Sequence, residues 1–317
     1  MVSLLLFPGQ GAQKVGMGKD LAAAFPAARA TFEAIDEALG LPLSRTMWEG
    51  PEDVLQQTDV TQPAILAHSA AVLAVVRERL GEVAGAAGHS LGEYSAYVSA
   101  GALPAVHGAR LVRRRGELMH RAGTARPGAM AAVIGLVTAE VERACREAGE
   151  GEGGIVVAAN LNTPDQTVIS GDPEAVARAG ERCKAAGAKR VLPLKVSGAF
   201  HSPLMAPAAE GLRAELEAAP FQEPAFPVVA NATGTPVRTA AEARRLLAEQ
   251  LTSPVRWVES MRTLAALAPQ RGDQAPEGTR FVEIGPGTVL GGLLKRILPE
   301  PSYLALGTAA EVERFLA

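Results

Sequence analysis

The sequence predicts an α/β protein in which a small domain is inserted into a larger one. The chain has 317 residues, of which 48% are hydrophobic, enough for one large core or two smaller ones. Residues 88–92 read GHSLG, a pattern in which a strand bends sharply into a helix. Residues 125–197 have a strand and helix order of their own. We therefore expect an α/β-hydrolase-like large domain with an inserted ferredoxin-like (βαββαβ) small domain.

The chain begins with an apolar segment, MVSLLLF, followed directly by Pro8 and Gly9. A secretion signal would carry a basic region and a longer apolar run, so we expect a buried first strand instead. No window approaches the roughly 18 apolar residues that a membrane-spanning helix needs. These features predict a soluble, cytoplasmic protein.

Residues 63–80 predict a helix that precedes the GHSLG turn. The segment begins at Pro63, a residue favoured at helix starts, and its apolar residues recur at helical spacing. His68 lies near this apolar side. We expect His68 to be a core or partly exposed histidine rather than a catalytic one.

Residues 125–197 predict four strands and two helices in the order β-α-β-β-α-β, which is the ferredoxin-like split unit. The expected strands are 129–136, 154–162, 166–172 and 188–196, and the expected helices are 138–149 and 173–187. The segments 1–124 and 198–317 would then form one discontinuous catalytic domain. A cleft between the two domains is a natural place for a ligand.

The segment after residue 198 is expected to complete the larger sheet. Residues 225–232 and 279–285 are apolar enough for strands, and residues 283–296 indicate a strand, a tight turn and a helix start. Residues 268–278 are polar and rich in Gly and Pro, which predicts a surface loop.

Charge and cysteine content exclude several function classes. The formal net charge of -3 gives no general attraction to nucleic acid or to anionic membranes. Cys145 and Cys183 are the only cysteines and lack metal-ligand spacing, so neither a disulfide framework nor a zinc site is expected. We expect no metal and no cofactor.

Ser90, at the centre of GHSLG, needs a base because a serine hydroxyl is a poor nucleophile at neutral pH. His89 should point elsewhere, since successive residues at a strand end face different ways. His107 and His120 stand among arginines in and around one helix. His201 lies in the turn-rich stretch VSGAFHSPLM, where functional side chains are often mounted, and is the favoured base.

A simple serine hydrolase would carry an acid between the serine and the histidine, and an HGGG-type loop. No HGGG is present. Asp165 and Asp172 have the right chain order but fall in the predicted small domain, which weakens both as triad members.

Arg115 is expected on the apolar side of its helix. It lies three or four residues from Leu111, Val112, Leu118 and Met119, which mark that side. A buried guanidinium stays charged and needs an anion, and a planar carboxylate matches its fork. The anion is either a protein carboxylate or a substrate with a free carboxylate.

Several stretches together are typical of one family. They are FPGQGAQKVGMG, TQPAIL, GHSLGEYSA, RRRGELM, GAMAAVIGL, GAFHSPLM, QLTSPVRW and EIGPGTVLGGLLKR, in this order over nearly the whole chain. The sequence resembles the malonyl-CoA:acyl carrier protein transacylases and the related acyltransferase domains of polyketide synthases.

The resemblance implies a role for individual residues. Ser90 matches the nucleophile, which takes the malonyl group from CoA as an ester, and His201 matches the general base. Arg115 matches the arginine that binds the malonyl carboxylate. Gln10 matches a residue whose backbone N–H forms the oxyanion hole together with that of the residue after the serine, here Leu91.

Two further positions follow from the resemblance. Gln250 matches a position whose backbone carbonyl orients the histidine, which would explain why no triad acid was found. Phe200, just before His201, accompanies malonyl rather than methylmalonyl specificity in related acyltransferases. It would fill the space that an α-methyl group needs.

Carrier proteins are acidic, and Lys189, Arg190 and Lys195 lie close to the His201 loop in sequence. Together with Lys184, Arg113 and Arg114 they form either a carrier docking patch or an ordinary solvated surface.

The activity expected from these features is transfer of malonyl from malonyl-CoA to acyl carrier protein in fatty acid synthesis, by a monomeric protein. A discrete polyketide-synthase malonyl acyltransferase, a serine thioesterase or esterase, and a catalytically idle carrier-binding subunit are the alternatives.

Overall fold

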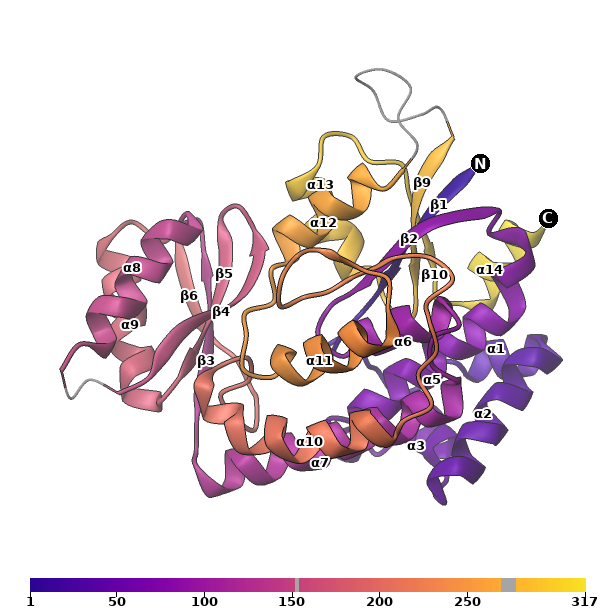
Figure 1. The fold of residues 1–317 in the computed structure, drawn as a ribbon, viewed down its shortest axis with the longest axis horizontal. Coiled ribbons are helices and arrows are strands. Elements are labelled where there is room, and N and C mark those ends of the chain that lie inside the picture. Colours follow the sequence, from indigo (N-terminus) through magenta and orange to yellow (C-terminus); the bar gives the residue numbers. More distant parts are fainter. Residues whose placement is uncertain (152–153, 269–277) are drawn as a thin grey trace.

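The computed structural model describes residues 1–151, 154–268 and 278–317, and contains helices packed on two β-sheets (Figure 1). One sheet has six strands in the order β10-β9-β1-β2-β7-β8, and the other has four in the order β4-β5-β3-β6. The predicted mixed α/β class is confirmed. Most of the predicted 268–278 loop, residues 269–277, lies outside the described residues.

The large sheet is parallel except at its β8 edge. β1 pairs with both β2 and β9, β9 with β10, and β2 with β7, all in parallel, whereas β8 runs antiparallel to β7. The strands are β1 (Val2–Phe7), β2 (Glu82–Gly88), β7 (Val228–Val229), β8 (Pro236–Val237), β9 (Thr279–Ile284) and β10 (Tyr303–Leu306).

The apolar first strand is buried on both faces, as parallel strands usually are. Leu5 and Phe7 of β1 pack into one core cluster, and Leu4 and Leu6 pack into another. The helices around this sheet are α1 (Lys19–Ala24), α2 (Pro26–Leu39), α3 (Leu43–Glu49), α4 (Glu52–Leu55), α5 (Thr58–Val76), α6 (Gly92–Ser99), α7 (Ala105–Ala125), α10 (Ala206–Ala218), α11 (Ala240–Gln250), α12 (Trp257–Ala266), α13 (Val289–Ile297) and α14 (Ala309–Leu316), with short 3-10 turns η1 (Arg77–Arg79) and η2 (Pro203–Met205).

Helix α5 corrects two expectations. It begins at Thr58, so Pro63 lies inside the helix rather than at its start. By length and composition alone, the continuous helical segment Thr58–Arg79 could cross a membrane. The expectation that no window approaches a membrane-spanning helix is therefore wrong. The fold accounts for this apolarity, because 78% of the apolar 18-residue window in this segment is buried in the protein, as in a core helix.

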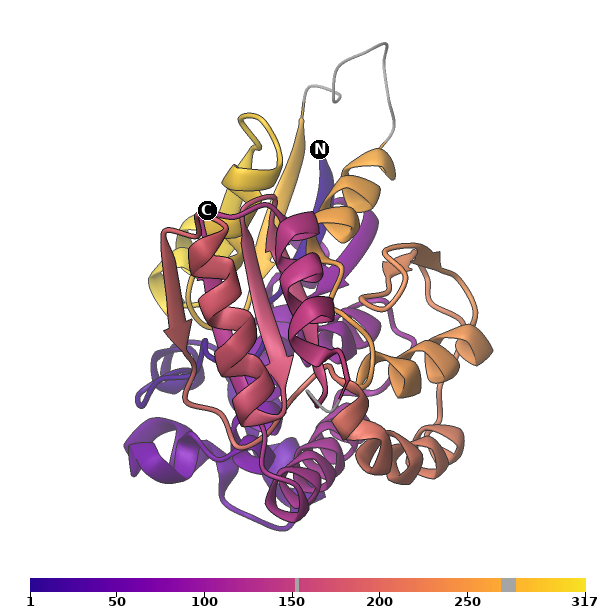
Figure 2. The same ribbon diagram turned by 90° about the vertical axis from the view of Figure 1, so that its left-hand side faces the viewer.

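The four-stranded sheet is built from residues 129–193 in the predicted order. Its elements are β3 (Ala129–Ile134), α8 (Thr138–Gly149), β4 (Val156–Thr163), β5 (Gln166–Gly171), α9 (Pro173–Ala185) and β6 (Arg190–Pro193). β3 pairs with β5 and β6, and β4 with β5, all antiparallel. Helices α8 and α9 cover the face of this sheet that points away from the large sheet (Figures 1 and 2). Cys145 and Cys183 are free thiols buried between these helices and the strands.

Backbone and ionic contacts join this sheet to the rest of the molecule. The N–H of Val255 donates to the carbonyl of Ala159 on β4 at 2.8 Å, and the N–H of Leu161 donates to the carbonyl of Val255 at 2.9 Å. At the β4–β5 turn, Asp165 forms an ion pair with Arg296 of α13 at 2.6 Å. The segment just after Gln250 is therefore held against β4.

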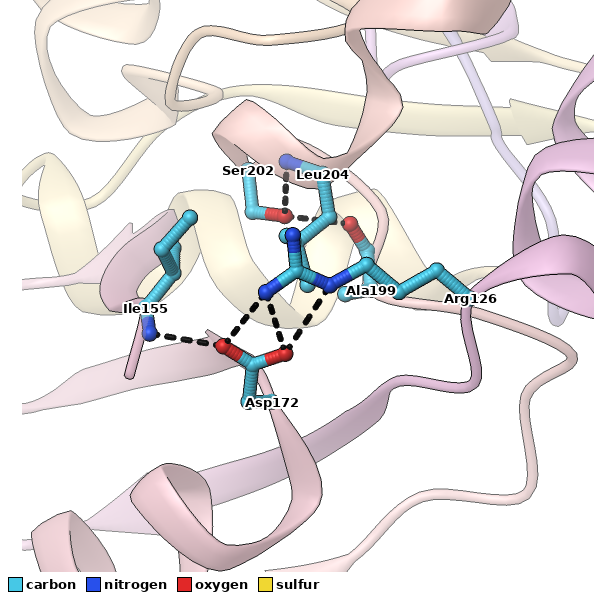
Figure 3. Close-up of polar contacts among 6 residues, drawn as sticks. All are labelled: Arg126, Ile155, Asp172, Ala199, Ser202 and Leu204. Carbon is cyan, nitrogen blue, oxygen red and sulfur yellow. Dashed lines mark hydrogen bonds and ion pairs between the residues drawn. The ribbon is translucent and has the colours of Figure 1, made fainter. Parts of the chain in front are cut away.

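A second contact lies where the chain leaves α7 for β3 (Figure 3). Arg126 donates to both carboxylate oxygens of Asp172 at 2.9 and 3.1 Å. Asp172 also accepts from the backbone N–H of Ile155 at 2.7 Å. This carboxylate ties the end of α7 to the start of α9.

Candidate active site

Ser90 sits on the tight turn between β2 and α6. Its φ is 52°, in the left-handed region that non-glycine residues rarely occupy. A Cβ on Gly88 would lie 1.9 Å from a backbone atom of Gly92, and one on Gly92 would lie 2.1 Å from the carbonyl oxygen of Phe7. Both outer glycines of GHSLG are therefore required by backbone packing, and they let the turn approach the end of β1.

Asn231, just beyond β7, fastens this turn. Its Oδ1 accepts from the backbone N–H of Ser90 at 2.7 Å, and its Nδ2 donates to the carbonyl of Gly88 at 2.7 Å. The unusual backbone of Ser90 is thus held by a side chain from a neighbouring strand.

His201 lies in the loop between β6 and η2. Its φ of 57° is also in the left-handed region. The next residue, Ser202, donates from Oγ to the carbonyl of Ala199 at 2.7 Å and accepts from the N–H of Leu204 at 3.3 Å (Figure 3). These bonds shape the turn that carries the histidine.

The structure brings Ser90 and His201 together. His201 Nε2 lies 2.8 Å from Ser90 Oγ, and His201 Nδ1 lies 3.0 Å from the backbone carbonyl oxygen of Gln250. A carbonyl only accepts, so Nδ1 carries the proton and donates to Gln250. Nε2 of the neutral ring is then free to accept the hydroxyl proton of Ser90.

Burial keeps His201 neutral. Removal from water, together with the positive charge of Arg115, lowers its pKa from 6.5 to about 3. The ring therefore has the protonation state that a base needs at neutral pH.

Arg115 is buried beside the same hydroxyl. Its Nη2 donates to Ser90 Oγ at 3.0 Å and to Gln250 Oε1 at 2.9 Å, while Nη1 donates to Gln62 Oε1 at 2.8 Å. No ion pair joins it to an Asp or Glu of the described residues. Of the two alternatives left open by the sequence, a direct pair with a protein carboxylate is therefore wrong for this part of the chain.

A pocket of about 130 Å³ opens in front of Ser90. Besides Ser90, Arg115 and His201, three further predicted residues line it, namely Gln10, Leu91 and Phe200. The rest of its wall is largely apolar and includes Met119, Met130, Leu194 and Val196, with His89 and Asn160 as the polar members.

A second pocket, of about 260 Å³, adjoins the first, because Gln10, His89, Asn160 and Leu194 line both. His89 Nε2 lies 2.9 Å from Asn162 Oδ1, so this ring turns toward Asn162 as its neighbour faces His201. Burial lowers the pKa of His89. The second pocket thus shares part of its wall with the pocket that contains Ser90.

The other candidate acids and bases lie elsewhere. Asp165 and Asp172 bind Arg296 and Arg126 respectively, and neither hydrogen-bonds to His201. His68 is buried in α5, as expected, and its pKa is lowered to about 4 by burial. Within the described residues no group of three His, Cys, Asp or Glu side chains could hold a metal ion.

The basic residues separate into two sets. Lys189, Arg190 and Lys195 are exposed on and around β6, with Leu194 of both pockets beside Lys195. The other three basic residues of the predicted patch already have ionic partners. Arg113 pairs with Glu117, Arg114 with Glu117 and Glu215, and Lys184 with Glu181.

Sequence reasoning missed three polar residues that contact predicted site residues, namely Gln62, Glu93 and Asn231, and a fourth, Asn162, that contacts His89 beside Ser90. Gln62 lies within the motif TQPAIL and Glu93 directly follows GHSLG, and both are polar residues in apolar surroundings. That pattern was the available signal. Asn162 and Asn231 lie in predicted strands without any comparable signal.

Comparison with known proteins agrees with this geometry. Residues 4–298 match the family model described as acyl transferase domain. Malonyl CoA-acyl carrier protein transacylase of Escherichia coli K12 is 44% identical, covering 95% of this chain and 96% of that protein. The Bacillus subtilis protein of the same name is 43% identical, covering 97% and 94%.

Solved structures are similar over the same length. A malonyl-transacylase, solved in complex with its type II polyketide-synthase acyl carrier protein, has a TM-score of 0.91 and 43% identity, covering 100% of this chain and 99% of that one. Sequence and backbone thus agree with one family over the whole chain. The chain belongs to the acyl transferase family, among the malonyl CoA-acyl carrier protein transacylases.

Proposed function

We propose that this protein transfers the malonyl group from malonyl-CoA to the phosphopantetheine thiol of acyl carrier protein through a malonyl-Ser90 intermediate. One observation carries the proposal. Ser90 Oγ lies 2.8 Å from the Nε2 of His201 and 3.0 Å from the guanidinium of Arg115, so nucleophile, base and a cation for a carboxylate meet at one atom. The names of the similar proteins support the same substrate and acceptor.

In the first half-reaction Ser90 Oγ attacks the thioester carbonyl while His201 Nε2 takes the hydroxyl proton. The backbone N–H groups of Gln10 and Leu91 are proposed to bind the oxyanion, each contributing about 3 kcal/mol of transition-state stabilisation. The C–S bond then breaks, and His201 returns the proton to the departing CoA sulfur.

In the second half-reaction His201 takes the proton of the carrier thiol, and the sulfur attacks the malonyl ester. The same oxyanion site is used again. Ser90 leaves as the alkoxide, regains its proton from His201 and the free enzyme is restored. The carbonyl of Gln250 holds the His201 ring in the required tautomer throughout.

Arg115 is proposed to bind the malonyl carboxylate. Its present acceptors are neutral, so its charge has no direct partner until the substrate arrives. Phe200, which lines the same pocket, is proposed to exclude an α-methyl group. The adjoining pocket lined by His89 and Leu194 is proposed to hold the pantetheine arm that CoA and carrier share.

We further propose that the six-stranded part is an α/β-hydrolase-like catalytic domain, residues 1–124 and 198–317, and that residues 125–197 form a ferredoxin-like insert. The sheet order β4-β5-β3-β6 supports the second assignment. The protein is proposed to act in the cytoplasm as a monomer without metal or cofactor, in fatty acid synthesis.

The test is intact-protein mass spectrometry after mixing with malonyl-CoA or acetyl-CoA, followed by phosphopantetheinylated carrier protein. Wild type should gain a malonyl group that moves to the carrier, and Ser90→Ala should gain none. Arg115→Ala should lose malonyl loading while retaining or gaining acetyl loading. If wild type releases malonate to water as fast as it loads, the thioesterase alternative is favoured. If no adduct forms at all, the catalytically idle carrier-binding subunit is favoured.

The same assay with two carriers addresses the pathway. A fatty-acid carrier and a type II polyketide carrier are offered in competition, and preferential malonylation of the first is expected. Preference for the second would assign the protein to polyketide synthesis instead.

A further inference from the structure

Glu93, the second residue of α6, is a carboxylate in the protein interior. Its side chain is fully buried, and its Oε2 accepts from the N–H of Asn231 at 3.0 Å and from Nε2 of Gln250 at 2.7 Å. Its Oε1 has no partner among the described residues. Burial of a carboxyl group costs free energy of folding unless hydrogen bonds offset it. Any benefit of Glu93 must therefore come from its two hydrogen bonds.

Both partners of Glu93 hold the peptide groups of Ser90. Asn231 accepts from the N–H of Ser90 at 2.7 Å, and Gln250 Nε2 donates to the carbonyl of Ser90 at 2.9 Å. Ser90 has a φ of 52°, which must be imposed by its surroundings. Glu93 thus anchors the backbone of Asn231 and the side chain of Gln250, the two residues that impose it.

Gln250 links Glu93 to the other two reacting groups. Its backbone carbonyl accepts from His201 Nδ1, and its Oε1 accepts from Arg115 Nη2. A guanidinium only donates and a carboxylate only accepts, so the Gln250 amide has one allowed orientation between Arg115 and Glu93. Without Glu93 the NH₂ of Gln250 would keep only the Ser90 carbonyl as an acceptor, so the amide would be held less firmly between Arg115 and Ser90.

The charge arrangement is consistent with this reading. Glu93 acts electrostatically on Arg115 across the Gln250 amide without touching it. When Glu93 is ionised, its charge lies one residue beyond Arg115 and leaves the donors of the arginine available for a substrate anion.

From this geometry we propose that Glu93 is a positioning residue for the transfer reaction, holding Gln250 and Asn231 so that Ser90, His201 and Arg115 keep their relative places. The inference rests on the proposed function, because it concerns the same reaction at the same site. The part of Glu93 that does this is the acceptor oxygen Oε2.

Burial raises the pKa of Glu93 to about 7, with the bonds from Asn231 and Gln250 and the charge of Arg115 acting in the opposite direction. The carboxylate and the carboxylic acid both offer an acceptor at Oε2. A glutamine can do the same with its carbonyl oxygen and place its NH₂ on the Oε1 side.

The experiment is rapid-quench mass spectrometry of malonyl-Ser90 formation. Its amplitude reports the fraction of competent enzyme, and its rate constant reports how fast that fraction is loaded. In Glu93→Ala the amplitude should stay near wild type while the rate constant falls by about 100-fold, as expected for displaced reacting groups. Glu93→Gln should keep the rate constant within about fivefold of wild type, since it gives up only charge assistance. The matched control is Ser95→Ala on the same helix, a buried hydroxyl with no hydrogen-bond partner in the described chain, which should leave both quantities unchanged.

Glu93→Asp serves if the alanine variant does not fold, because it keeps the charge but withdraws the acceptor by one methylene. It should lower the rate constant by about tenfold. The proposal is overturned if Glu93→Ala or Glu93→Asp loads at the wild-type rate constant, if only the amplitude falls, or if Glu93→Gln is as slow as Glu93→Ala. Failure of wild type itself to load would instead refute the proposed function.

Discussion

At the scale of single residues, the two proposed reacting side chains share an unusual backbone. Ser90 and His201 have φ values of 52° and 57°, and each is held by neighbours rather than by its own preference. Asn231 holds the first, and Ser202 shapes the turn of the second. In this backbone conformation the side chains of Ser90 and His201 point toward each other.

The low pKa of His201 predicts the pH dependence of loading. Its pKa in the folded protein is lowered from 6.5 to about 3, so the ring stays neutral as the solution is acidified through 6.5. We expect kcat/KM for malonyl loading, which reports the free enzyme, to stay level from about pH 8 to about pH 5. Stopped-assay initial rates at subsaturating malonyl-CoA measure it. A tenfold fall per pH unit beginning near 6.5 would show that His201 titrates normally.

Phe200 is expected to set selectivity against an α-methyl group. Phe200→Ala should raise kcat/KM for methylmalonyl-CoA relative to malonyl-CoA by about 10- to 200-fold, the usual value of one methyl group in an apolar pocket. The measurement is competitive loading followed by mass spectrometry. Phe226→Ala, at a partly buried phenylalanine outside the pocket that contains Ser90, is the control and should leave the ratio unchanged. An unchanged ratio in Phe200→Ala would exclude this role.

Single residues were predicted from the sequence where a local pattern carried the signal. Arg115 was recognised as buried because it stands among the apolar residues of its own helix, and burial is observed. Gln62 and Glu93 were missed, because a pattern within one helix does not reveal which side chains of other helices reach it.

At the scale of elements, α5 and α7 pack closely beside the site, where Arg115 of α7 binds Gln62 of α5. Gly116 permits this approach, since a Cβ there would lie 2.6 Å from the Cα of Asp59 and 2.7 Å from the carbonyl oxygen of Thr58. Backbone atoms at the start of α5 cannot yield as a side-chain tip can.

Gly116→Ala is therefore expected to destabilise the protein by about 1 to 3 kcal/mol, despite alanine's higher helix propensity. The matched control is Gly292→Ala in α13, where the Cβ meets nothing within 4 Å. It should stabilise by up to about 1 kcal/mol. Urea titration followed by circular dichroism gives both free energies of unfolding. The same sign for both variants would contradict the packing argument.

Most elements around residues 129–193 were predicted closely, because alternating strands and amphipathic helices carry strong periodicity. The helix α8 matches the predicted 138–149. The start of α5 was missed because Pro63 was taken as a helix start, whereas the helix tolerates it within its second turn. The strand predicted at 225–232 is only two residues long in β7, since an apolar run reports burial more than pairing.

At the scale of the whole molecule, the four-stranded sheet contributes residues to the wall of the pocket that contains Ser90. Asn160 of β4, Met130 of β3 and Leu194 just after β6 line the pocket that contains Ser90, whereas Leu91 and Arg115 come from the part built on the large sheet. The bonds of Val255 to β4 hold the two parts together just after Gln250. The shape of the pocket thus depends on how the two parts dock.

The exposed basic residues near β6 predict a docking surface for the acidic carrier. Lys189→Glu with Arg190→Glu should raise KM for the carrier and leave KM for malonyl-CoA unchanged, because the charges act on the macromolecule's approach. Steady-state transfer kinetics at low salt measure both constants. The control reverses two exposed basic residues, Lys19 of α1 and Arg45 of α3, helices that lie apart from the four-stranded sheet in Figure 1, and should change neither constant. If both constants stay the same in the first variant, the surface is an ordinary solvated one.

By itself the sequence determined the kind of chemistry: a serine on a sharp turn, a histidine on a later loop and an arginine on an apolar helix face, since each is a local pattern. The tertiary structure decided how they combine. It places the carbonyl of Gln250 at His201 and leaves Arg115 without a direct protein anion in the described chain. It also places Glu93 in hydrogen-bond contact with the Gln250 amide that binds Arg115. These relations join residues 49 to 157 positions apart, and they depend on how sheet and helices pack rather than on any local pattern.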